Sequence, residues 1–263
     1  MRRIALVFSF IAFATGCAQN APAPAPDRAE IRTASDLTDA DRRAAPRLEL
    51  AALYFSSGQY ETALDEIKLA LAARPDLAPA FNLRGLIYSA MGEERLADES
   101  FQRALQINPR DADAMHNRGW FQCQLRRYDD ADRLFEQALA QPSYREPART
   151  LLAQGVCQAR AGRLETAEQK LSRAFELDAA NPTVALNLAE VLYRRREYER
   201  ARFYVRRVNQ SEELSSVASL WLALRIEHRL DNRTGVEALG RQLRNRFPQA
   251  PETRSFERGQ FDD

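Results

Sequence analysis

The stretch that decides the fold runs from Arg47 to Pro75 and reads RLELAALYFSSGQYETALDEIKLALAARP. It contains two apolar runs separated by a Gly, small residues at intervals, and a closing Pro. The arrangement returns 34 residues later and again after a further 34. The recurring positions are Gly85, Tyr88, Gly92, Ala97, Phe101, Ala104 and Pro109, and then Gly119, Ala131, Phe135 and Ala138. A fixed period of this length indicates stacked helix–turn–helix units.

This pattern resembles the tetratricopeptide repeat, in which Gly or Ala, Tyr, Ala, Phe, Ala and Pro recur at fixed offsets. The resemblance implies an all-α fold, a right-handed α-solenoid of about six helix pairs over 44–248. We expect the last pair to be a terminal cap and residues 249–263 to be a polar, frayed tail. The repeats are placed at about 44–77, 78–111, 112–145, 146–181, 182–215 and 216–248.

Composition limits the function classes. The chain has 263 residues, with 38 Lys and Arg against 37 Asp and Glu. This balance shows neither the basic excess typical of nucleic-acid binding nor the acidic excess typical of disorder. The sequence has no apolar run of about 18 residues, so we expect no membrane-spanning helix in the mature protein.

The N-terminal 16 residues have the features of a targeting signal. Arg2 and Arg3 precede a short apolar run, and small residues precede Cys17. A plain secretory signal is one interpretation. The segment also resembles a bacterial lipoprotein signal, which implies that Cys17 carries lipid, although Ala14 stands where that signal usually has Leu. By the same resemblance, Ala18 implies sorting to the outer membrane.

Residues 17–43 are interpreted as a Pro-rich tether between the lipid anchor and the folded part. An alternating Ala-Pro run over 21–26 favours extended polyproline II backbone. A disordered leader with no further role is the compatible alternative.

The residues for a catalytic site are missing from the sequence. Its two His, His116 and His228, lie in different repeats without partnered Cys or carboxylate patterns. No Gly-rich phosphate loop, zinc-ligand spacing or nucleophile elbow occurs. We therefore predict a binding module with no catalytic residues, metal, cofactor or small-molecule substrate. An enzyme regulator or a cryptic hydrolase stays open as an alternative.

The tetratricopeptide resemblance implies that the first helix of each unit lines a concave, protein-binding groove. Helical spacing predicts the residues on that face, and an apolar strip with two Asn that bind extended backbone is expected there. Burial between repeats is the alternative. The absence of matched Lys argues against a chaperone C-terminal tail as ligand. The predicted groove residues are Leu48, Ala52, Phe55, Asn82, Leu86, His116, Asn117 and Trp120, with Ser89, Cys123, Leu152, Val156, Glu190 and Tyr193 on the same faces.

Cys123 and Cys157 lie in the first helices of consecutive repeats, which are neighbours in a solenoid. In an oxidising compartment this favours a disulfide between them. Two buried thiols that pack as small hydrophobic residues are the alternative.

A basic cluster follows in repeat 5, and it is interpreted either as a solvated convex face or as a surface for an acidic partner or lipid headgroups. Its members are Arg194, Arg195, Arg196, Arg200, Arg202, Arg206 and Arg207.

Signal, tether and repeats together resemble the type IV pilus biogenesis and stability lipoproteins, the pilotins of the pilus secretin. The repeat phrases over 83–88 and 117–121 are similar to that family. The resemblance implies localisation on the periplasmic face of the outer membrane, binding of secretin subunits and promotion of their multimer assembly. An outer-membrane scaffold that recruits peptidoglycan enzymes or barrel-assembly factors is the alternative.

Overall fold

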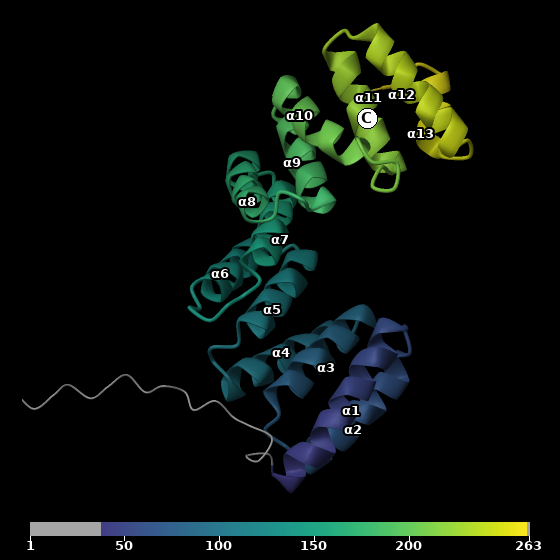
Figure 1. Ribbon diagram of the computed structural model, residues 1–263. Helices are drawn as coiled ribbons and strands as arrows, with labels where there is room; N and C mark the ends of the chain where they lie inside the picture. Colours follow the sequence, from purple (N-terminus) through teal and green to yellow (C-terminus); the bar gives the residue numbers. More distant parts are fainter. Residues whose placement is uncertain (1–37, 262–263) are drawn as a thin grey trace, which may run out of the picture. The chain divides into compact units, whose positions relative to one another are not determined.

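The computed structural model describes residues 38–261, which form thirteen α-helices without a β-strand (Figure 1). This confirms the all-α prediction. The predicted signal, Cys17 and most of the tether lie outside the described residues. In chain order the helices are α1 Asp39–Ser56, α2 Tyr60–Ala73, α3 Ala78–Ala90, α4 Glu94–Ile107, α5 Ala112–Gln124, α6 Tyr128–Leu139, α7 Pro147–Arg160, α8 Leu164–Leu177, α9 Pro182–Arg194, α10 Tyr198–Asn209, α11 Val217–Arg229, α12 Arg233–Arg246 and α13 Pro251–Glu257.

Each odd-numbered helix from α1 to α11 packs on the following even-numbered helix, and the even-numbered helix packs on the next pair. Within five of these pairs, a small residue on the first helix lies opposite a large residue sixteen positions later. A Cβ on Gly119, for example, would lie 2.9 Å from Phe135. The contact therefore requires a small residue. The pairs are Ala51 with Ile67, Gly85 with Phe101, Gly119 with Phe135, Gly155 with Leu171, and Ala189 with Val205, and every side chain in them is buried.

A residue with positive φ ends the first helix of each repeat. Gly58 and Gly92 have φ values of 76° and 79°. In repeats 3 and 5 the same role falls to Arg126 and Arg196, with φ values of 60° and 64°. Gly is favoured at such positions because its missing Cβ removes the steric penalty.

The helical array begins earlier than we predicted. We expected the tether to extend to residue 43, but α1 already starts at Asp39. Buried contacts explain the difference. Ala44 is buried, and the buried carboxylate of Asp41 forms an ion pair with Arg74 after α2. This pair ties the first turn of α1 to the exit of repeat 1.

The array also ends later than we predicted. Residues 249–263 were expected to be a frayed tail, but α13 forms within them. Its Phe256 ring packs over Gly240 of α12, where a Cβ would lie 2.0 Å from the ring. The buried Thr253 donates a hydrogen bond of 2.7 Å to the carbonyl of Phe247. One apolar ring and one hydroxyl thus fix a segment whose composition is otherwise polar.

No helix within residues 38–261 is long and apolar enough to cross a membrane.

Candidate protein-binding groove

The first helices of repeats 3, 4 and 5 line an open hollow of about 400 Å³. Trp120 of α5 and Leu152 and Val156 of α7 are its large apolar lining residues, and α9 contributes Thr183 and Asn187. Polar groups stand at the margin, where Arg149 and Thr183 are exposed. An apolar hollow with a few polar groups at its edge suits the side chain of a bound peptide. The lining residues are His116, Trp120, Arg149, Leu152, Ala153, Val156, Thr183 and Asn187.

Of the eight predicted groove residues, the structure brings His116 and Trp120 together in this hollow. Leu152 and Val156, from the faces predicted for repeat 4, join them. Arg160 stacks over the Trp120 ring, with its Cζ 5.1 Å from the ring centroid. The position of Trp120 is therefore set from both sides, by packing in the core and by this cation–π contact.

The two predicted backbone-binding Asn contact each other. Asn117 Nδ2 donates to Asn82 Oδ1 at 3.2 Å, and Arg149 donates to Asn117 Oδ1 at 3.0 Å. Arg149 also forms an ion pair of 3.3 Å with Asp113. Asn117 is buried, whereas Asn82 is half-buried. A ligand backbone would therefore reach Asn82 more easily than Asn117.

His116 lines the hollow, and its ring is also hydrogen-bonded to a buried side chain of α7. Its Nδ1 lies 2.8 Å from Thr150 Oγ1, and the same hydroxyl lies 2.6 Å from Tyr144 Oη. His116 is only 6% exposed. Desolvation, and secondarily the charge of Arg149, lower the pKa of His116 to about 4. His116 is therefore neutral at ordinary pH and presents a hydrogen-bonding, uncharged wall.

The predicted groove residues of repeats 1 and 2 lie apart from the hollow. Leu48 and Phe55 are half-buried and pack against the core of the first repeat, and the Phe55 ring lies 6.0 Å from Tyr60. Ala52 is exposed. Leu86 is half-buried against the cluster around Phe101. These residues line no part of the hollow.

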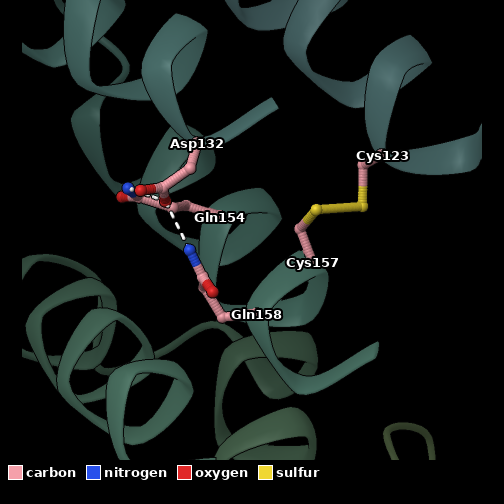
Figure 2. Close-up of a disulfide and its surroundings, with 5 residues drawn as sticks. All are labelled: Cys123, Asp132, Gln154, Cys157 and Gln158. Atoms are coloured by element: carbon pink, nitrogen blue, oxygen red, sulfur yellow. Dashed lines mark hydrogen bonds between the residues drawn. A yellow bond between two sulfur atoms is a disulfide. The ribbon is translucent and has the colours of Figure 1, made fainter. Parts of the chain in front are cut away.

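Cys123 of α5 and Cys157 of α7 form a disulfide in the structure (Figure 2). Their Cα atoms are 5.8 Å apart, within the usual range for such a bond. Both residues are buried in a cluster that also contains Ala153 and the Trp120 side chain. The bond therefore joins the two helices that carry most of the hollow.

Carboxylates on the second helices of the repeats accept hydrogen bonds from the first helix of the next repeat. Asp98 accepts hydrogen bonds from Arg118 and Gln122 of α5, both at 3.0 Å. Asp132 accepts from Gln154 and Gln158 of α7, at 2.8 Å and 2.5 Å (Figure 2). Acidic residues recur at this register, with Glu168 as the third. This periodic signal is visible in the sequence, because each of these acidic residues directly follows a buried Ala of the repeat.

Beside Asp132, the Glu136 carboxylate accepts from Lys170 at 2.6 Å and from Gln154 at 2.7 Å. These two hydrogen bonds, that of Lys170 first, lower the pKa of Glu136 below its ordinary value. The buried amide of Gln154 therefore lies between two carboxylates of the preceding helix.

Sequence reasoning missed four residues of the hollow: Arg149, Ala153, Thr183 and Asn187. Each of these lies two or six residues before the small packing residue of its helix, whereas the predicted faces used the positions three before, one after and four after, with the position two before only at Asn117. In repeats 3 and 5 the position four residues after the small packing residue points into the core, since Cys123 and Tyr193 are buried. The repeat spacing could have identified the missing positions, because Arg149 and Thr183, like Ala153 and Asn187, are 34 residues apart.

Comparison with known proteins identifies tetratricopeptide repeats in the chain and homologues along its length. Models of the tetratricopeptide repeat match residues 78–111, 100–133 and 158–220. The type IV pilus assembly protein PilF of Pseudomonas aeruginosa is 28% identical over 255 residues, which is 97% of this chain and 98% of PilF. The chain is a tetratricopeptide-repeat protein homologous to PilF and PilW.

Solved structures agree with this assignment. The crystal structure of PilW, described as a widely conserved type IV pilus biogenesis factor, superposes with a TM-score of 0.75 at 29% identity. It covers 81% of this chain and 97% of PilW. The structure of Pseudomonas aeruginosa PilF has the same TM-score at 26% identity, covering 84% of this chain and all of that one. The tetratricopeptide solenoid that we predicted is confirmed.

Proposed function

We propose that this protein is an outer-membrane-anchored factor that binds the type IV pilus secretin and promotes its localisation and multimer assembly. The observation that carries the proposal is the similarity to PilF along nearly the whole chain. The hollow of repeats 3 to 5 supplies a binding element that suits this role, because it offers apolar walls with polar groups at the margin.

The proposed mechanism needs no catalysed step. An acyl chain on Cys17 holds the protein at the membrane, and the groove holds a secretin segment. Attachment to one surface raises the local concentration of secretin subunits, which favours their assembly. Two or more acyl chains on one residue give stable anchoring, since each buried methylene contributes about 0.8 kcal/mol.

Two variants in the source bacterium test the anchor and the groove separately. Cys17→Ser removes the lipidation site. Val156→Arg places a long charged side chain in the hollow, and Gln102→Arg on the exposed side of α4 is its matched control. We expect secretin multimers in the outer-membrane fraction, measured by native electrophoresis, to fall sharply with the first two variants and to be unchanged with the control. Normal amounts of secretin multimer in each of the two single variants, Cys17→Ser and Val156→Arg, would refute the proposal.

The scaffold alternative predicts a different set of bound proteins. Cross-linking from position 156 in membranes should recover secretin peptides if the proposal is correct. Peptidoglycan enzymes or barrel-assembly subunits in their place would support the scaffold role instead.

A further inference from the structure

The outward face of α10 carries an exposed aromatic ring among arginines. Phe203 is 58% exposed and is the only aromatic residue among the large apolar side chains exposed within residues 38–261. Residues one turn away on the helix share its face. These are Arg200 and Arg207, with Arg206 and Glu199 beside them, and all four are exposed.

The charge on this face is unbalanced. Within α10, Tyr198–Asn209, the exposed charged residues comprise three Arg and one Glu. They are Arg200, Arg206, Arg207 and Glu199.

In two ion pairs of this region a more exposed guanidinium lies over a less exposed carboxylate, whereas in the pair of Arg202 with Glu199 the carboxylate is the more exposed partner, at 65% against 27%. Arg200 pairs with Glu168 at 2.7 Å, and the two side chains are 49% and 13% exposed. Arg206 pairs with Glu227 at 2.9 Å, with exposures of 58% and 5%. Arg200 also pairs with Glu197, but a guanidinium has five N–H donors, so pairs with one or two carboxylates leave donors free for solvent. Apart from the exposed Glu199, an approaching molecule therefore meets positive charge before it meets negative charge on this face.

The exposed ring of Phe203 packs against a neighbouring aromatic side chain, which in turn packs against α8. Phe203 and Tyr204 are T-shaped with centroids 5.1 Å apart, and Tyr204 contacts Phe175 of α8 in the same geometry at 5.1 Å. Arg207 lies over Phe175, with 5.5 Å from its Cζ to the ring centroid. The side chain of Phe203 is thus supported from within α8 and α10 while more than half of it meets solvent.

We propose that this face of α10 docks on the surface of an anionic phospholipid bilayer. Phe203 enters the headgroup region, and the outward guanidinium groups of Arg200, Arg206 and Arg207 pair with lipid phosphates. Arg suits phosphate because its planar fork donates two parallel hydrogen bonds. Aromatic and aliphatic side chains beside basic residues are the combination that holds peripheral proteins at a membrane interface.

A bilayer fits the face better than an acidic protein does. The anchor side chains of protein partners occupy pockets, but neither the hollow of about 70 Å³ that Arg207 borders nor the hollow of about 330 Å³ that Arg206 borders has Phe203 in its lining. A membrane surface needs no pocket. Contact through one ring and a few charges is weak, but it becomes effective as a second signal beside a lipid anchor. In that respect the inference rests on the anchoring proposed for Cys17.

Vesicle sedimentation tests the proposal without the anchor. The probe protein is the chain from residue 18 onward, which lacks Cys17 and keeps every helix described. The vesicles consist of phosphatidylcholine alone or of an equal mixture with phosphatidylglycerol. We expect binding to the anionic vesicles only, and loss of that binding near 1 M salt, where the Debye length is about 3 Å.

The variants isolate the two components of the contact. Phe203→Ala should lower the partition coefficient at least about five-fold by removing the inserted ring. Arg207→Gln should lower it about five-fold by removing one phosphate contact. The control is Leu53→Ala on α1, because Leu53 is 64% exposed and has no such arginine cluster. It should bind as the parent does, and thermal unfolding followed by circular dichroism checks that each variant is folded.

Three outcomes would overturn the proposal: no binding to anionic vesicles, equal binding to both vesicle types, or a Phe203→Ala variant that binds as well as Leu53→Ala. Failure on vesicles combined with cross-linking of an acidic protein from position 203 in cells would assign the face to a protein partner. Secretin assembly that depends on Cys17 while vesicle binding fails would reject only this inference. Vesicle binding with secretin assembly independent of Cys17 would reject only the proposed function.

Discussion

The ring of Phe101 on α4 fills the space that a side chain on Gly85 of α3 would occupy. A Cβ built on Gly85 would lie 2.7 Å from the Cδ1 and Cε1 atoms of that ring. In repeat 5, Ala189 meets the smaller Val205 at the same two positions. The two residues of such a pair therefore share a fixed volume, as expected for close-packed interiors.

Gly85→Ala should lower the free energy of unfolding by about 1 kcal/mol, because overpacking at about 1–3 kcal/mol exceeds the gain in helix propensity. Adding Phe101→Val copies the pair of repeat 5 and makes room for the new methyl group. We expect a double-mutant cycle in urea to give a favourable coupling of about 1 kcal/mol between the two changes. A coupling near zero would contradict the shared-volume account.

Arg126→Gly should stabilise the protein by about 1 kcal/mol, since a non-Gly residue at positive φ costs about 1–3 kcal/mol and Gly loses part of this gain to chain entropy. Arg127→Gly is the matched control, because Arg127 has a φ of −86° and donates to Gln122. It should be neutral or destabilising. Urea unfolding of both variants decides the matter, and a larger stability for Arg127→Gly would refute the prediction.

The bond between Cys123 and Cys157 closes a segment with a sequence separation of 34. Its loss in the Cys123→Ala, Cys157→Ala double variant should cost about 3–4 kcal/mol through restored chain entropy in the unfolded state. Alkylation of the unreduced protein followed by mass spectrometry checks the bond itself. Two alkylated thiols would show that both residues pack as reduced Cys. Added reductant should destabilise the parent and leave the double variant unchanged.

Acid should destabilise the fold through His116. Its folded-state pKa of about 4 lies below the ordinary value of 6.5, so between these values the unfolded chain binds a proton that the folded chain does not. The contribution is complete above pH 6.5 and is lost as pH falls towards 4, by up to about 3 kcal/mol. The groups that face the ring are Arg149, Thr150 and, through Thr150, Tyr144.

Urea unfolding from about pH 7 to about pH 4 measures this loss as a slope in stability. His116→Gln should remove most of the slope, although its stability at neutral pH will be lower because a buried contact changes. His228→Gln, at an exposed position of α11, should keep the slope. Equal slopes in His116→Gln and the parent would assign the acid sensitivity to other groups.

Several elements could be predicted from sequence because their causes are local. The exit of repeat 1 at Pro75 and the helix end at Gly58 follow from backbone restrictions of single residues. The two ends of the array could not be predicted in the same way. The first turn of α1 depends on the pair between Asp41 and Arg74, and α13 depends on Phe256 reaching Gly240. Asp41 and Arg74 are far apart in sequence, whereas Gly240 and Phe256 have the same sixteen-residue separation as the small and large residues of the helix pairs, so the repeat spacing could have indicated α13.

The candidate site likewise has features that follow from local helical spacing and features that depend on contacts between repeats. Helical spacing predicted His116, Trp120, Leu152 and Val156 on the concave faces of repeats 3 and 4, and in the structure these four residues line one hollow. It did not show that Asn82 and Asn117 would bond to each other, nor that Leu48 and Phe55 would pack in the core of the first repeat.

The sequence by itself determined the repeat, its period and the positions that must be small, because each helix pair packs within a segment of 33 to 36 residues. Only the tertiary structure decided which side chains of α5, α7 and α9 line one hollow and which arginines of α10 lie above buried carboxylates. Both depend on how one repeat rotates against the next, and that rotation is set by contacts such as Asp132 with Gln154 and Gln158. The identity of a residue determines which interactions its side chain can form, whereas its neighbours in the next repeat determine whether a ligand can reach it.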